Sequence, residues 1–274
     1  MEPLTLIAGP CVIENESTVC GICEYLKEIT EKLNINLIFK ASFDKANRSS
    51  INSFRGPGLD EGLAILEKIK NKYQVKTLTD IHESYQADIT AEVVDVIQIP
   101  AFLSRQTDLL VAATKAVINK NKIINIKKGQ FLAPWDMKQV INKINESGLS
   151  TNSNKIWLTE RGNSFGYNTL VVDFRSLVEL KKFKCPVIFD ATHSVQQPGG
   201  KGNCSGGQRE FVAPLGRAAI AVGVDGIFME VHQDPENAKS DGPNMVPLNR
   251  VEKILNDFML IRNSLGDSLA VSTL

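Results

Sequence analysis

VVDVIQI (Val93–Ile99) and PVIFD (Pro186–Asp190) are short runs in which most side chains are apolar. Runs of this kind are typical of strands that are covered on both faces, as in a parallel sheet. Each is flanked by longer segments with apolar residues at helical spacing, and this alternation recurs along the whole chain. The alternation predicts a parallel sheet wrapped by helices.

The pattern contains eight strand–helix units. The predicted strands are Leu4–Ala8, Asn36–Lys40, Lys76–Thr79, Val94–Ile99, Ile123–Lys127, Lys155–Thr159, Val187–Asp190 and Gly226–Val231. The predicted helices lie near residues 16–33, 58–72, 84–91, 106–119, 135–147, 171–182, 209–222 and 247–264. Eight units in 274 residues predict an α/β fold, a single (β/α)8 TIM barrel that occupies residues 1–274. An open doubly wound sheet is the competing topology.

The composition narrows the class of protein. Hydrophobic residues make up 43% of the chain and charged residues 23%, which is typical of a soluble globular protein. Acidic and basic residues balance at 31 each, so the net charge gives no reason to expect nucleic acid or a membrane surface as a partner. The first residues, MEPLTLIAGPC, lack the features of a secretory signal. We therefore expect a cytoplasmic protein.

The cysteines do not resemble a disulfide framework, because they are odd in number and scattered. They are Cys11, Cys20, Cys23, Cys185 and Cys204. Cys20 and Cys23 form a CxxC, but it falls inside the first predicted helix, whereas a thioredoxin-like motif sits where a strand gives way to a helix. We interpret these two cysteines as structural.

The glycine-rich stretch Pro198–Gly207 lies between the seventh strand and its helix, which predicts a βα loop that closes over the site. It lacks the spacing of a Walker A loop.

Polar residues gather where the predicted strands end. In a TIM barrel, the carboxyl ends of the strands build the active site. One set comes from the first, seventh and eighth strands, which are neighbours in a closed barrel: Cys11, His193, Glu230 and Asp241. A thiolate, an imidazole and two carboxylates suit a divalent metal. A cationic set suits a substrate with phosphate and carboxylate groups: Lys40, Lys45, Arg48, Lys127 and Arg161.

Each set has other interpretations. A cysteine or histidine at a strand end can be a packed or hydrogen-bonded structural residue, and the two carboxylates can pair with lysines. Lys127 can also be the Schiff-base lysine of a class I aldolase. Arg48 and Arg105 can be surface charges.

Several segments, in order along nearly the whole chain, resemble the family of 3-deoxy-D-manno-octulosonate 8-phosphate synthases. They include FKASFDKANRSSINSFRGPGLDEG (Phe39–Gly62), VIQIPAFLSRQTDLL (Val96–Leu110), IFDATHSVQ (Ile188–Gln196) and DPENAKSDGPN (Asp234–Asn244). TDIHE (Thr79–Glu83), NIKKGQF (Asn125–Phe131) and ERGNSFGYNTLVVD (Glu160–Asp173) match as well. KANRSS is specific, because the related 3-deoxy-D-arabino-heptulosonate 7-phosphate synthases, which use erythrose 4-phosphate, typically have a KPRTS-like sequence there.

The resemblance implies condensation of phosphoenolpyruvate with arabinose 5-phosphate, on the route to the 3-deoxy-octulosonate of lipopolysaccharide. The implied catalytic residues are Lys40, Lys45, Asn47, Lys127, Arg161 and Asp241. Phosphoenolpyruvate would be held by the lysines and Arg161, with Ser42, Gln98 and the backbone of Ala101 close by. Arabinose 5-phosphate would be held by Asn47, Arg48 and Ser49, with Asp80 near its hydroxyls. Arg105 matches an arginine that reaches a neighbouring subunit, which implies a homotetramer.

The family has a metal-dependent branch and a branch with asparagine at the cysteine position. Cys11, in GPCVIE, places this sequence in the metal-dependent branch, with His193, Glu230 and Asp241 as the other implied ligands. Iron, zinc, manganese and cobalt all suit such a site, and no organic cofactor is expected. The alternatives that remain are the heptulosonate synthase, the Schiff-base aldolase and a sugar-phosphate binding protein.

Overall fold

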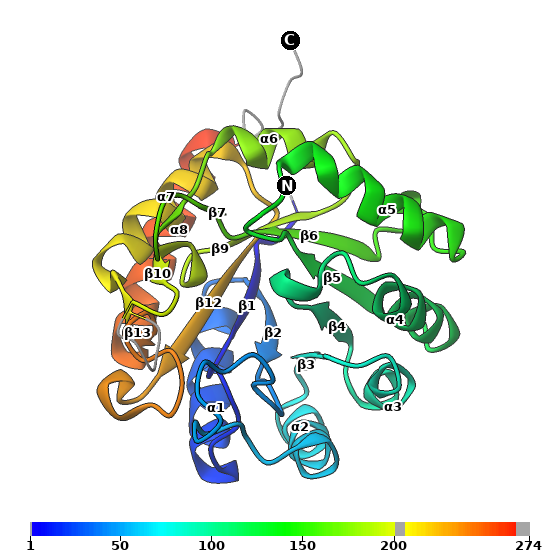
Figure 1. The fold of residues 1–274 in the computed structure, drawn as a ribbon. Coiled ribbons are helices and arrows are strands. Elements are labelled where there is room, and N and C mark those ends of the chain that lie inside the picture. The colour runs from blue at the N-terminus through cyan, green and yellow to red at the C-terminus, as the bar shows by residue number, and fades with distance from the viewer. Residues whose placement is uncertain (1, 201–205, 267–274) are drawn as a thin grey trace.

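The computed structural model describes residues 2–200 and 206–266, and a closed barrel of parallel strands forms its centre (Figure 1). The strands of the barrel are β1 (Thr5–Gly9), β2 (Asn36–Lys40), β3 (Lys76–Asp80), β4 (Val96–Ile99), β5 (Ile123–Lys127), β6 (Ile156–Glu160), β9 (Val187–Asp190) and β12 (Gly226–His232). β1 pairs in parallel with both β2 and β12, so the sheet closes on itself. The predicted (β/α)8 barrel is confirmed.

A helix follows each strand of the barrel and packs on its outer surface (Figure 1). The helices are α1 (Glu16–Lys32), α2 (Leu59–Tyr73), α3 (Gln86–Val93), α4 (Thr107–Asn119), α5 (Met137–Glu146), α6 (Arg175–Lys181), α7 (Val212–Val222) and α8 (Val251–Leu265). In α1, Val19, Ile22 and Leu26 form a buried stripe at helical spacing, which packs the helix against the sheet. The Asn15 side chain accepts a hydrogen bond from Thr18 N (2.8 Å) and caps the start of this helix.

The barrel interior is filled by an apolar layer that lies below a charged layer. The apolar side chains are Ile7, Ile38, Leu78, Val96, Ile188 and Phe228. Lys127 Nζ lies 3.7 Å from the centre of the Phe228 ring, and Lys40 Nζ lies 5.7 Å from it. The packed floor therefore ends where the lysines of the barrel mouth begin.

Gly9 allows the end of β1 to approach β2 closely. A β-carbon at this position would lie 2.0 Å from the carbonyl oxygen of Lys40, which no side chain tolerates. Two residues further on, the carbonyl oxygen of Cys11 accepts a hydrogen bond from Lys40 Nζ (2.8 Å). The glycine thus places Cys11 over the mouth of the barrel.

The structure corrects several predicted boundaries. β4 begins at Val96 instead of Val94, and α6 begins at Arg175 instead of residue 171. The latter prediction was wrong because Leu170–Val171 form β8, which pairs antiparallel with β7 (Asn163–Ser164). Three other predicted helices begin with 3₁₀ turns: η2 (Pro134–Asp136), η5 (Arg209–Phe211) and η7 (Leu248–Arg250). β10 (Gln196–Gln197), β11 (Gly206–Gly207) and β13 (Val246–Pro247) are too short to leave a periodic signal.

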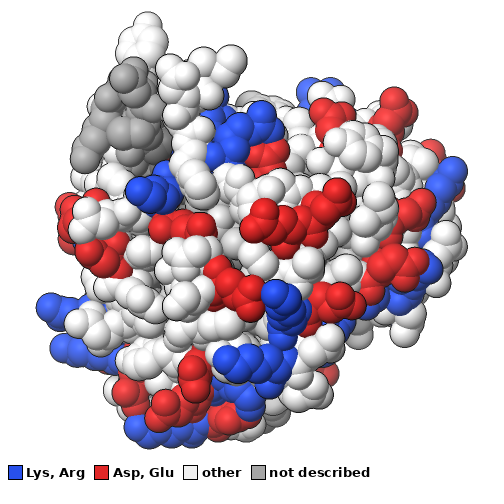
Figure 2. Space-filling view, turned by 90° about the horizontal axis from the view of Figure 1, so that it is seen from below, with Lys and Arg blue, Asp and Glu red and all other residues white. Residues whose placement is uncertain are grey.

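Three further features bear on the predictions made from the sequence. Cys20 and Cys23 lie within α1, as predicted, with Cys23 buried and Cys20 half-buried. On the face shown in Figure 2, Lys and Arg are interspersed with Asp and Glu. None of the helices in the described ranges has the length and hydropathy of a membrane-spanning segment.

Candidate active site

A cavity of about 730 Å³ lies at the carboxyl ends of the strands. The residues predicted to bind phosphoenolpyruvate that line it are Lys40, Lys45, Gln98, Ala101, Lys127 and Arg161. The predicted sugar-phosphate residues that line it are Asn47, Arg48, Ser49 and Asp80. His193, Glu230 and Asp241 line it as well, so residues from most of the chain meet in one cavity.

Three predicted residues lie elsewhere. Ser42 is buried behind the cavity and donates a hydrogen bond from its hydroxyl to Asp80 Oδ1 (2.5 Å). Arg105 is exposed beyond η1 (Ala101–Leu103), and its carbonyl oxygen accepts a hydrogen bond from Lys143 Nζ (2.9 Å). Cys11 is fully buried beside Asp241 and Glu230.

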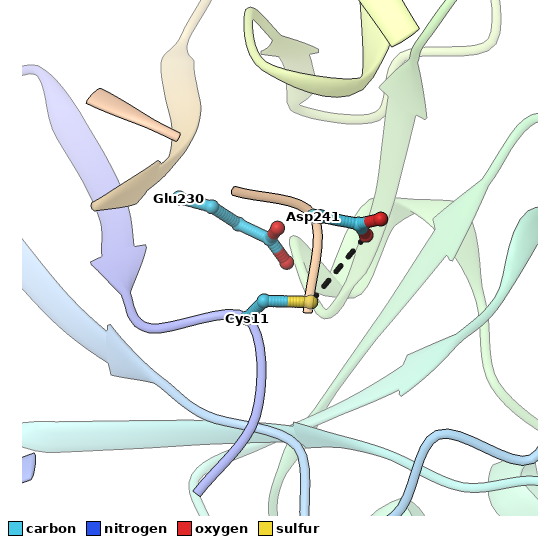
Figure 3. Close-up of side chains that lie close together, drawn as sticks. All are labelled: Cys11, Glu230 and Asp241. Atoms are coloured by element: carbon cyan, nitrogen blue, oxygen red, sulfur yellow. Dashed lines mark hydrogen bonds between the residues drawn. The ribbon is translucent and has the colours of Figure 1, made fainter. Parts of the chain in front are cut away.

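Cys11, Glu230 and Asp241 converge, as Figure 3 shows. One ligand atom from each lies within 4.8 Å of the others, and Cys11 Sγ is 3.4 Å from Asp241 Oδ2. His193 faces the same point, because its Nε2 lies 3.7 Å from Glu230 Oε2 and 3.8 Å from Asp241 Oδ2. The structure therefore brings the four predicted ligands together, although they come from β1, β9 and β12 and the segments that follow them.

The donor set fits a divalent metal. Glu230 Oε2 is buried and has no hydrogen-bond partner among the described residues, which is costly unless a cation satisfies it. Burial, together with Glu230, raises the pKa of the Cys11 thiol, whereas a coordinated thiol is deprotonated. A thiolate, an imidazole and carboxylates together suit zinc, iron, cobalt or manganese.

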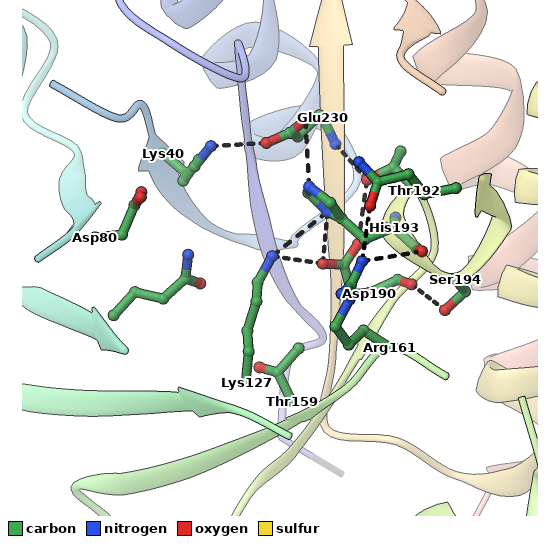
Figure 4. A network of polar contacts seen from close by, with 12 residues as sticks. Lys40, Asp80, Lys127, Thr159, Arg161, Asp190, Thr192, His193, Ser194 and Glu230 are labelled. Atoms are coloured by element: carbon green, nitrogen blue, oxygen red, sulfur yellow. Dashed lines mark hydrogen bonds and ion pairs between the residues drawn. The ribbon is translucent and has the colours of Figure 1, made fainter. Parts of the chain in front are cut away.

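Asp190 orients His193, and no role had been assigned to it from the sequence. Its Oδ2 lies 2.8 Å from His193 Nδ1 and 2.6 Å from Lys127 Nζ, and its Oδ1 accepts a hydrogen bond from the backbone N–H of His193 (Figure 4). A carboxylate on Nδ1 leaves Nε2 free to act as a ligand. Burial alone would raise the pKa of Asp190, but His193 and Lys127 hold it well below its usual range.

Lys40 connects the cationic residues to the ligand cluster. Its ammonium donates to Glu230 Oε1 (2.8 Å), and this ion pair is buried. Burial alone would raise the pKa of Glu230, but Lys40, His193 and Lys45 lower it, so the carboxylate is charged. Burial alone would lower the pKa of Lys45, but Cys11, Asp80 and Glu230 raise it above its ordinary value. Lys45 is therefore a cation at neutral pH.

Arg161 enters the cavity from the end of β6. Its Nη2 donates to Gln196 Oε1 (2.9 Å) and lies 3.5 Å from the carbonyl oxygen of His193. The Glu160 carboxylate holds the backbone behind it, because its Oε1 accepts hydrogen bonds from the N–H groups of Arg161 (2.9 Å) and Gly162 (2.6 Å). Lys128 points away from the cavity and is bound by Asn163 Oδ1 (2.7 Å). Of the two adjacent lysines, only Lys127 faces the substrate side.

The side of the cavity that is predicted to bind the sugar phosphate is built from the β2–α2 and β12–α8 segments. Arg48 donates to the carbonyl oxygens of Phe54 and Lys239, at 3.1 Å each. Burial alone would raise the pKa of Asp80, but Lys45 and His82 hold it well below its usual range. The predicted lid, Pro198–Gly207, includes residues 201–205, which lie outside the described residues.

The fold and the site define the class of this protein: a TIM-barrel enzyme with a cation-lined cavity and a candidate divalent-metal site at the carboxyl ends of its strands. The chain belongs to the DAHP synthetase I family, whose model matches residues 2–261. It is 59% identical over 265 residues to a 2-dehydro-3-deoxyphosphooctonate aldolase of Cyanothece sp., covering 97% of this chain and 94% of the relative. Proteins of the same name from Geotalea uraniireducens (59% identity, 94% of this chain and 92% of the relative) and Fusobacterium nucleatum (57%, 91% and 87%) are also similar.

Proposed function

We propose that this chain is a 3-deoxy-8-phosphooctulonate synthase, an enzyme also called 2-dehydro-3-deoxyphosphooctonate aldolase. It would condense phosphoenolpyruvate with D-arabinose 5-phosphate and water to give 3-deoxy-D-manno-octulosonate 8-phosphate and phosphate. The observation that carries the proposal is one cavity that joins the lysines and Arg161 to the Cys11–Glu230–Asp241 cluster. The names of relatives up to 59% identical support the substrate assignment.

Electrostatics explains the arrangement of the cations. Both substrates carry phosphate, and phosphoenolpyruvate also carries a carboxylate, so they repel one another in water. Lys45, Lys127 and Arg161 offset this repulsion at one end of the cavity, and Arg48 does so at the sugar-phosphate end. Holding two anions at reacting distance contributes on the order of several kcal/mol to catalysis.

The reaction requires two new bonds and one bond cleavage. C3 of phosphoenolpyruvate bonds to the aldehyde carbon of the sugar, whose oxygen takes a proton and becomes a hydroxyl. The oxygen of water bonds to C2, and one of its protons supplies the aldehyde oxygen. The C2–O bond to phosphate then breaks as the new C2 hydroxyl loses its remaining proton and becomes the keto group, so phosphate leaves with its bridging oxygen and this proton. The sequence of bonds needs no redox step, and the cations of the cavity stabilise the phosphate as it leaves.

We propose Cys11, His193, Glu230 and Asp241 as the residues that hold one divalent metal ion of the iron, zinc, manganese or cobalt class. When bound, the ion supplies a Lewis acid for the aldehyde oxygen or orients the attacking water. Lys40 keeps Glu230 ionised, and Asp190 keeps Nε2 of His193 directed at the cluster. The protein thus presents a preorganised set of donors.

The rival interpretations are less well supported. The names of the relatives specify an octonate, which disfavours the heptulosonate synthase that uses erythrose 4-phosphate. A Schiff base needs a neutral lysine. Burial lowers the pKa of Lys127, but Asp190 opposes this, and its carboxylate 2.6 Å from Nζ stabilises the ammonium form. We also propose a cytoplasmic homotetramer that serves lipopolysaccharide synthesis, with the exposed Arg105 reaching a neighbouring subunit.

Phosphate release from phosphoenolpyruvate tests the proposal. Enzyme stripped with a chelator, and the same sample after divalent metal is restored, would each be supplied with arabinose 5-phosphate or erythrose 4-phosphate. We expect release with arabinose 5-phosphate, lost on stripping and regained with metal. Activity that survives verified removal of metal would contradict the role of the Cys11 cluster, and preference for erythrose 4-phosphate would contradict the substrate assignment.

A further inference from the structure

Gln196 bridges the two halves of the site. Its Oε1 accepts a hydrogen bond from Arg161 Nη2 (2.9 Å), and its Nε2 donates to Asp241 Oδ1 (3.3 Å). The residue lines the cavity directly after η4 (His193–Val195). Its backbone N–H donates to the carbonyl oxygen of His193, and it pairs with Gly207 across β10 and β11. These contacts hold the backbone of Gln196 in place and leave the side-chain amide to be positioned by Arg161 and Asp241.

The chemistry of the two partners requires an amide between them. A guanidinium only donates hydrogen bonds, and an ionised carboxylate only accepts them. A neutral amide satisfies both partners in one orientation, so the placement of its oxygen and nitrogen is determined by its neighbours. A carboxylate at this position would repel Asp241, and an apolar side chain would lose both bonds.

The bridge also assigns the two oxygens of Asp241 to different partners. Oδ1 accepts the hydrogen bond from Gln196, whereas Oδ2 lies 3.4 Å from Cys11 Sγ and 3.8 Å from His193 Nε2. Gln196 thus turns one oxygen of Asp241 toward the candidate metal ligands. Its Oε1 also fixes the guanidinium of Arg161, which faces the anionic substrate.

We propose that Gln196 is a positioning residue that couples the anion site at Arg161 to the ligand site at Asp241. The proposal rests on the proposed function. Occupation of either site orders the shared amide, so each ligand strengthens the binding of the other by the same factor. The coupling should be at least about fivefold, the lower end for linked sites.

Two variants and one matched control test the coupling. Gln196→Met keeps the length of the side chain and removes both hydrogen bonds, and Gln196→Ala removes them with a smaller side chain. Gln197→Ala is the control, because Gln197 lies on the same short strand but does not line the active-site cavity. Circular dichroism and thermal melting would show that each variant is folded.

The affinity of stripped enzyme for Co²⁺ would be read from the cobalt–thiolate absorption, with and without phosphoenolpyruvate. Calorimetry would give the affinity for phosphoenolpyruvate with and without Co²⁺. We expect both Gln196 variants to bind Co²⁺ about tenfold more weakly. We expect the coupling factor to fall at least about fivefold in these variants, to the part that the charge of the ion alone supplies, and to stay unchanged in Gln197→Ala.

The outcomes separate this proposal from the proposed function. A normal cobalt–thiolate band with the same coupling factor in wild type and both Gln196 variants would overturn the bridge alone. A wild-type enzyme without the band, or without condensation activity, would overturn the metal site or the reaction, and the bridge with it. Loss of coupling in Gln197→Ala as well would also overturn the specific role of Gln196.

Discussion

Replacing Asp190 with asparagine tests whether the buried carboxylate organises the site. The substitution changes the charge and almost nothing in volume. Asp190 has no exposed surface. Its two oxygens form ion pairs with Lys127 and His193 and accept a hydrogen bond from the Thr192 hydroxyl. Asparagine offers one acceptor oxygen and one amide that donates, so one of these partners meets a donor instead of an acceptor.

The magnitude follows from burial. Removing one partner of a buried ion pair leaves the other charge uncompensated and costs about 3–5 kcal/mol. In this protein the charge left behind is Lys127, whose side chain is 7% exposed. The matched control is Asp173→Asn, because Asp173 pairs with Arg175 at 2.8 Å while the two side chains are 52% and 89% exposed. An exposed pair contributes at most about 1 kcal/mol.

Urea unfolding of the metal-free proteins would measure both variants, because bound metal adds its own stabilisation. We expect Asp190→Asn to lower the free energy of unfolding by about 3 kcal/mol and Asp173→Asn by less than about 1 kcal/mol. Cobalt titration of the folded Asp190 variant should show an affinity about 10–100-fold weaker, because His193 loses the carboxylate that directs it.

Two results would refute this reasoning. If both variants unfold with the same free energy and the same dependence on urea, burial does not decide the contribution of the Asp190–Lys127 pair. If stability falls but the cobalt affinity of Asp190→Asn equals that of wild type, the carboxylate does not orient His193.

Three further predictions concern stability and binding. Burial raises the pKa of the Cys23 thiol to about 12 from its ordinary 9.0, so the folded state resists deprotonation. Cys23 should therefore lower the free energy of unfolding as the pH rises above 9, by about 2 kcal/mol at roughly pH 10.5, and the decline in Cys23→Ala should be smaller than that of wild type by this amount in urea titrations. Gly9→Ala places a methyl group 2.0 Å from a carbonyl oxygen and should lower the free energy of unfolding in urea by more than about 2 kcal/mol. Gly21→Ala is the control inside α1: its methyl group meets only a flexible glutamine side chain, so the change should be neutral or stabilising. Arg48→Ala should raise KM for arabinose 5-phosphate about tenfold or more in steady-state kinetics, with unchanged calorimetric affinity for phosphoenolpyruvate.

The barrel could be predicted because its elements have strong local signals. Parallel strands such as Val187–Asp190 are mostly apolar, and helices such as α1 carry an apolar stripe. Each element can therefore be predicted from a short stretch of sequence. The β7–β8 hairpin and the strands β10, β11 and β13 each contain only two residues per strand. Their pairing depends on tertiary position, which local composition does not encode.

The residues of the candidate site that lie at strand ends could be predicted, because the carboxyl ends of the barrel strands converge. Position alone placed Cys11, His193, Glu230 and Asp241 at one end of the barrel, and the resemblance assigned their roles. The contacts of Asp190 and Gln196 were missed, because each depends on where a side chain from another strand points. The Asp190 contact does have a sequence signal, because an aspartate ends an apolar strand three residues before a ligand histidine. No comparable signal exists for Gln196, whose partners lie 35 and 45 residues away.

The predicted metal ligands and the predicted cationic residues form one network in the structure. Lys40 contacts Glu230, and Asp190 contacts both Lys127 and His193. The inner acidic side chains are equal in number to the inner basic ones: Asp80, Asp190, Glu230 and Asp241 against Lys40, Lys45, Lys127 and Arg161. The protein alone is therefore close to neutral where the proposed reaction brings together two phosphorylated substrates. A divalent ion with one thiolate adds one net positive charge, so metal loading should strengthen anion binding even before any chemical step. The same argument explains how Lys40 and Lys127 remain buried without substrate, because Lys40 pairs with Glu230 and Lys127 pairs with Asp190 until an anion arrives.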